Sequence, residues 1–78
     1  MPAEDSVRVE VAYEGGQAFT ALMPVEAADE LERRLAGGDE GVAVIDAEDG
    51  RYAVVLRRVA YVKRFLRESR VGFGTPGP

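Results

Sequence analysis

Apolar and polar residues alternate at the start of the chain, as is typical of a half-buried β-strand. The apolar positions are Val7, Val9, Val11 and Tyr13. Residues 14–17 contain two glycines, which accept the positive φ of a tight turn at little steric cost. A second apolar segment follows at 18–23. The pattern therefore predicts a β-hairpin over residues 7–23.

The length of this turn decides which faces of the two strands meet, because a slip of one residue moves every side chain to the other face. A two-residue loop pairs Val11 with Thr20 and Val9 with Leu22. A three-residue loop pairs Val11 with Phe19, Val9 with Ala21 and Val7 with Met23. The second register places the larger apolar side chains on the same face as Val7, Val9 and Val11, so we favour it.

Residues 24–36 carry the signals of an amphipathic helix. Pro24 suits the first helical position, and the acids that follow suit the positive end of the helix dipole. A narrow apolar stripe has helical spacing and consists of Val25, Ala28, Leu31 and Leu35. On the polar face, we expect i,i+4 ion pairs from Asp29 to Arg33 and from Glu30 to Arg34. The glycines at 37 and 38 end the helix.

Two further apolar segments, 41–46 and 52–56, flank a hairpin turn signal at 48–50. Both are apolar on both faces, a pattern normally found in strands that are covered on both sides. One helix covers only one face of a sheet. We therefore expect a second copy of the chain to cover the other face, with an oligomer interface at Ala43, Ile45, Ala53 and Val55.

Residues 59–66 are compatible with a strand or with a helix. As a strand, they place Val59, Tyr61 and Phe65 on one face and Ala60, Val62 and Leu66 on the other. We favour a short fifth strand, because the segment is rich in β-branched and aromatic residues. The predicted class is α+β: a small antiparallel sheet with one helix, in the order β-β-α-β-β. A single domain spans 1–78, with an ordered core over 6–73 and flexible ends at 1–5 and 75–78.

The amino-acid composition excludes several kinds of catalytic and metal-binding site. The 78 residues include neither Cys nor His, so disulfides, thiolate metal sites and the commonest general base are excluded. The acidic turn at 46–50 lacks the length and spacing of a calcium loop. The paired glycines lack the rest of a phosphate-loop motif. We therefore expect no enzyme activity, no cofactor, no metal and no small-molecule substrate. Absence of a membrane span or secretory signal favours a cytoplasmic protein.

Charge is divided unevenly. Residues 1–50 hold thirteen acids against three arginines, a balance of −10, and residues 51–78 hold seven bases against one acid, a balance of +6. Basic residues interleaved with aromatic ones are typical of nucleic-acid contacts. The candidate binding residues are Arg57, Arg58, Tyr61, Lys63, Arg64, Arg67 and Arg70. Alternatively, these bases pair with the acidic helix or with a neighbouring copy, and the aromatics belong to the core.

The string at residues 54–64 resembles part of the trp RNA-binding attenuation protein family. Members of that family are β-rich chains that close into rings and bind single-stranded RNA with basic residues. The central helix predicted here departs from that pattern, and the element order resembles that of many small bacterial and phage proteins. The leading interpretation is a homo-oligomeric regulatory protein that binds nucleic acid, in particular RNA. The alternative is a protein-interaction or structural module without a nucleic-acid ligand.

Overall fold

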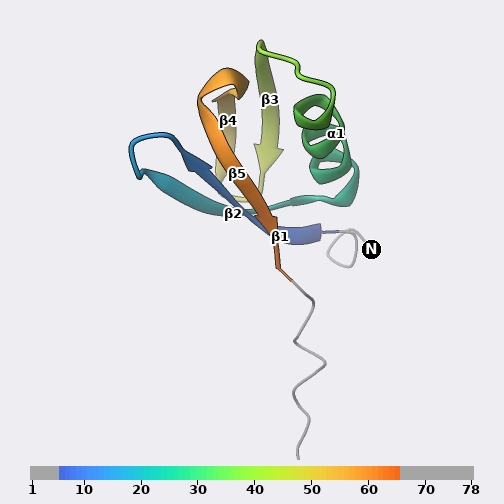
Figure 1. The fold of residues 1–78 in the computed structure, drawn as a ribbon. Helices are drawn as coiled ribbons and strands as arrows, with labels where there is room; N and C mark the ends of the chain where they lie inside the picture. Colours follow the sequence, from blue (N-terminus) through green and yellow to red (C-terminus); the bar gives the residue numbers. More distant parts are fainter. Residues whose placement is uncertain (1–5, 66–78) are drawn as a thin grey trace, which may run out of the picture.

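The computed structural model describes residues 6–65 and confirms an α+β chain with a fifth strand (Figure 1). The predicted flexible ends, and residues 66–73 of the predicted core, lie outside this range. The elements are β1 (Ser6–Tyr13), β2 (Ala18–Pro24), α1 (Val25–Ala36), β3 (Val42–Ala47), β4 (Gly50–Val55), the 3₁₀ turn η2 (Leu56–Arg58) and β5 (Val59–Arg64). No helix of the described part is long and apolar enough to cross a membrane.

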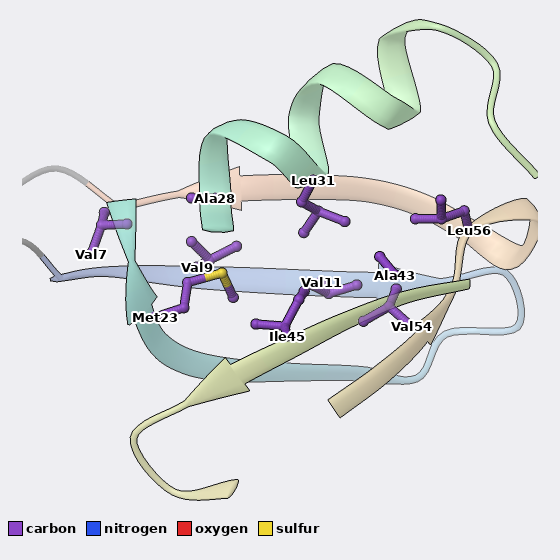
Figure 2. Packing of buried hydrophobic residues seen from close by; sticks show 10 residues of the cluster. All are labelled: Val7, Val9, Val11, Met23, Ala28, Leu31, Ala43, Ile45, Val54 and Leu56. Atoms are coloured by element: carbon purple, nitrogen blue, oxygen red, sulfur yellow. The ribbon is translucent and has the colours of Figure 1, made fainter. Parts of the chain in front are cut away.

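The strands form two sheets, whereas the sequence predicted one. A three-stranded sheet has the order β2-β1-β5, and β3 and β4 form a separate hairpin. In Figure 2, that hairpin crosses β1 and β2 obliquely and shares their inner face with α1. One backbone hydrogen bond, from Glu48 N to Leu22 O at 2.9 Å, joins the hairpin turn to β2. The hairpin packs across the inner face of β1, which carries Val7, Val9 and Val11. This packing buries the inner side of the hairpin, which would stay exposed if the hairpin extended the sheet sideways.

The first hairpin has the favoured register. Val11 pairs with Phe19, and Val7 pairs with Met23. The Gly15 and Gly16 φ values are +101° and +100°, a backbone conformation that side chains rarely adopt. Val7, Val9, Val11 and Met23 are buried, and Leu22 points outward. The prediction of a three-residue loop is confirmed, because this register buries the larger side chains together.

Helix α1 ends in a Schellman motif. Gly38 adopts a φ of +79°, and the Asp39 amide donates a 3.0 Å hydrogen bond to Arg34 O. The predicted i,i+4 ion pairs are wrong: Arg33 pairs with Glu30 instead. Arg34 turns to Asp39, with its Nε 2.8 Å from Asp39 Oδ2. The end of the helix brings that carboxylate back toward the last turn, where Arg34 reaches it.

The core draws on both sheets and on α1 (Figure 2). Its buried members are Val7, Val9, Val11, Met23, Ala28, Leu31, Ala43, Ile45, Val54 and Leu56. No polar or charged residue of the described part is buried. The inner face of the β3–β4 hairpin thus completes a core that the helix alone leaves open.

Strand β5 contains a bulge that changes the predicted division of its faces. Ala12 pairs with Tyr61, but Tyr13 pairs with Val59, so Ala60 is left without a partner in the ladder. Val59 and Val62 consequently both pack against the core, and Tyr61 lies exposed on the opposite face. A regular strand would have placed Val59 and Tyr61 together. The extra residue turns Val59 inward, where burial of its side chain is favourable.

Candidate interaction surfaces

The basic residues of the C-terminal part lie in different environments. Arg57 and Arg58 are exposed on η2 and form no ion pair within residues 6–65. The Arg58 carbonyl accepts a 2.9 Å hydrogen bond from the Glu14 amide, which ties η2 to the first hairpin loop. Arg67 and Arg70 lie outside the described residues. Of the predicted site residues within 6–65, Arg57 and Arg58 are therefore accessible on η2, apart from the acids of α1.

Arg64 joins β5 to the polar face of α1. Its Nη2 lies 2.9 Å from Asp29 Oδ1, and its Nε lies 3.1 Å from Glu32 Oε2. Hydrogen bonding to Asp29 is the main cause of the raised pKa of Arg64. A guanidinium held by two carboxylates is poorly placed to bind phosphate. Arg64 thus fits the interpretation in which bases of the second half pair with the acidic helix, and its two partners are 32 and 35 residues away in the chain.

Tyr61 and Lys63 lie on the outer face of the three-stranded sheet. The Tyr61 hydroxyl donates a 3.1 Å hydrogen bond to Glu10 Oε2, and this bond is the main cause of the raised Tyr61 pKa. Lys63 lies opposite Glu10 in the ladder, with its Nζ 4.6 Å from the centre of the Phe65 ring. Both residues are accessible, yet a carboxylate lies beside them. The negative charge of Glu10 therefore opposes the binding of an anionic ligand at Tyr61 and Lys63.

The outer face of the β3–β4 hairpin is apolar and uncovered. Val42, Val44 and Val55 retain 50%, 62% and 38% of their accessible surface, and Ala53 is exposed beside them. Val42 pairs with Val55, and Val44 pairs with Ala53, so the four side chains form one patch. We call these four residues the valine patch. Large apolar side chains gathered on one exposed face commonly mark an interaction surface.

The valine patch corrects the predicted interface. Ala53 and Val55 belong to it, but Ala43 and Ile45 are buried in the core on the opposite face. A three-residue loop over 48–50 would have placed Ala43 opposite Val55 and Ile45 opposite Ala53 on one face. The two-residue turn Glu48-Asp49 instead pairs Ala47 with Gly50, which places Val44 opposite Ala53 and Val42 opposite Val55. Val42 and Val44, which were not among the predicted interface residues, therefore belong to the exposed face.

Charged residues border the valine patch at both ends. Beyond Val44 and Ala53 lie Asp46 and Arg51, paired with Oδ1 and Nε 2.8 Å apart. The hydrogen bond to Asp46 raises the pKa of Arg51. Beyond Val42 and Val55, the Leu56 amide bonds to Gly41 O at 2.9 Å, and exposed Glu40 and Arg57 follow. The patch has a polar rim at each end, as protein interfaces commonly do.

The described residues hold no group of three or more carboxylates able to bind a metal ion. The surface of the described part includes open hollows. One lies between β2 and the β3–β4 turn and is lined by Arg8, Thr20, Leu22 and Glu48, among others. Another lies between the end of α1 and β5, lined by Leu35, Val59 and Val62. Neither holds a buried polar side chain that could direct a reaction.

Comparison with protein-family models, with curated proteins and with solved structures finds no match for this chain.

Proposed function

We propose that the protein acts as a homo-oligomeric interaction module without enzymatic activity. The valine patch is the observation that supports this proposal. Each fully buried valine contributes about 1.5–3 kcal/mol relative to an exposed one, and an interface would cover four apolar side chains on one surface. Small domains with thin cores gain stability from such association. The distribution of charge agrees, because Arg51 and Arg64 are already paired with carboxylates.

Oligomer mass tests the proposal. Sedimentation equilibrium at micromolar concentration should give a multiple of the 8.4 kDa chain mass. Val44→Asp should reduce that mass to the monomer, because it places a charge in the middle of the patch. Thr20→Asp is the matched control: it adds the same charge to an exposed strand position of the other sheet and should preserve the oligomer. A wild-type monomer would contradict the proposal.

Nucleic-acid binding is a second candidate, supported by the exposure of Arg57 and Arg58. Neither has a carboxylate partner within residues 6–65, so both are accessible to phosphate. If Arg58 contacts the RNA backbone, Arg58→Ala should weaken single-stranded RNA binding. It should also reduce the slope of log affinity against log salt by about 0.7, the value for one released phosphate contact.

Arg33→Ala is the control for that measurement, since Arg33 is an exposed arginine on α1 that pairs with Glu30. It should leave the salt dependence unchanged. If the wild type binds neither single-stranded RNA nor DNA at low salt, this second candidate is wrong and the interaction module stands alone.

A further inference from the structure

The outer face of the β3–β4 hairpin has two lines of different chemistry. The β3 line reads Val42, Val44 and Asp46, and the β4 line reads Val55, Ala53 and Arg51. The ladder pairs Asp46 with Arg51 at the turn end and Val42 with Val55 at the other end. One line thus ends in an acid and the other in a base, and the rest of each line is apolar.

This division makes the face complementary to itself in one orientation. We infer that two copies pack their valine patches face to face about a two-fold axis parallel to the strands. β3 of one copy then lies over β4 of the other. The inference rests on the proposed function and names its partner, a second copy of the chain. Each contact occurs twice, as a two-fold interface requires.

The contacts in this arrangement match in size and in charge. Val44, the most exposed of the patch valines, lies over the partner's Ala53, so a large side chain meets a small one. Val42 lies over the partner's Val55. At the turn end of the patch Asp46 faces the partner's Arg51. Apolar burial supplies affinity, and the charged rim selects the orientation.

The opposite orientation is disfavoured by charge. A two-fold axis in the interface but perpendicular to the strands places β3 over β3 and β4 over β4. Asp46 would then lie over the partner's Val42, and Arg51 over the partner's Val55. Each charge would lose water without gaining an opposite charge from the partner, which is unfavourable. The ion pair within each chain does not remove this preference, because Asp46 and Arg51 keep 74% and 73% of their side-chain surface exposed.

Reciprocal charge reversals test the orientation. In an Asp46→Arg homodimer the new cation faces the partner's Arg51, and in an Arg51→Asp homodimer the new carboxylate faces the partner's Asp46. Each variant alone should dimerise about tenfold more weakly than the wild type, because interfacial like charges oppose association. An equal mixture should form a heterodimer, since each new charge then meets its opposite. Native mass spectrometry distinguishes the three dimers by mass.

Glu26→Arg is the matched control, because it makes the same charge reversal at an exposed position of α1. It should dimerise like the wild type. Circular dichroism should show that all variants fold, since the changed positions are exposed. A wild-type monomer would overturn both the proposed function and this inference. A wild-type dimer that Asp46→Arg leaves intact, or a mixture that forms no heterodimer, would overturn the orientation alone.

Discussion

Phe19 on β2 and Tyr52 on β4 stack face to face, with ring centres 4.3 Å apart and planes 2° from parallel. Tyr13 on β1 extends the contact, its ring centre 6.3 Å from that of Phe19. The Tyr52 hydroxyl donates a 2.7 Å hydrogen bond to Asp49 Oδ2, which helps to fix the ring. This aromatic row connects the three-stranded sheet to the β3–β4 hairpin. It therefore helps to hold the second sheet across the first.

The stacked pair should be energetically coupled. We expect a double-mutant cycle of Phe19→Ala and Tyr52→Ala to give a coupling free energy of about 0.5–1.5 kcal/mol, the value typical of aromatic pairs. Urea denaturation of the four proteins measures it. A cycle of Phe19→Ala with Tyr61→Ala is the control, because Tyr61 lies on the opposite face of the sheet and should show no coupling. Equal coupling in both cycles would contradict the role assigned to the stack.

Neighbouring residues of β2 should differ sharply in their contribution to stability. Met23 is fully buried in the core, and Leu22 points outward. Met23→Ala should reduce the free energy of unfolding by about 2–5 kcal/mol, since it removes buried methylene groups and leaves a cavity. Leu22→Ala should cost less than roughly 1 kcal/mol. Chemical denaturation compares the two. Similar losses would mean that the outer face of this sheet is covered in solution.

Local signals explain why the first hairpin was predicted correctly. Burial of Met23 follows from the alternation in β1 and the preference for the larger apolar set, both of which lie within twenty residues. The end of α1 at the paired glycines is equally local. Such features depend on residues that are close in sequence and on backbone geometry. They can therefore be predicted from one sequence.

The position of the second sheet depends on contacts between distant residues, which periodicity does not encode. The stack of Phe19 with Tyr52 and the ion pairs of Arg64 with Asp29 and Glu32 belong to this group. The bulge at Ala60 follows from the competition between ladder pairing and burial of Val59. The misplaced interface residues depend on the length of the second turn, because a loop over 48–50 with three residues pairs Ala43 with Val55, whereas the observed two-residue turn pairs Val42 with Val55.

The Asp39 carboxylate should titrate below its ordinary range. The hydrogen bond from Arg34, followed by that from the Gly41 amide, lowers the pKa of Asp39 from 3.8. A lowered folded-state pKa stabilises the fold above the unfolded value, and this contribution is lost as pH falls through the folded value. Arg34→Gln should raise the Asp39 pKa toward 3.8 without fully reaching it, since the Gly41 amide remains. Carboxyl NMR titration measures the change.

The companion measurement for Asp39 is stability against pH. The difference between wild type and Arg34→Gln should be present at neutral pH. It should narrow as the pH falls below about 3.8 and through the lower folded-state pKa, below which Asp39 is protonated in both proteins. Arg33→Gln serves as control, because Arg33 contacts Glu30 and not Asp39. An Asp39 pKa that Arg34→Gln does not move would show that the Gly41 amide alone holds the carboxylate.

The two glycines that end α1 should respond differently to alanine. Gly38 has a φ of +79°, in the left-handed region that side chains disfavour, and Gly37 has a φ of −85°. Gly38→Ala should reduce the free energy of unfolding by about 1 kcal/mol or more, because Cβ crowds the backbone there. At Gly37 an added Cβ would lie 3.5 Å from Arg33 O, an ordinary contact. Gly37→Ala should therefore be neutral or stabilise the protein by up to about 1 kcal/mol, because it lowers the conformational entropy of the unfolded chain.

Thermal and urea denaturation of the two variants under the same conditions give the comparison. Equal effects would mean that the left-handed residue is not required for the Schellman motif, and the chain would have to leave the helix by another route.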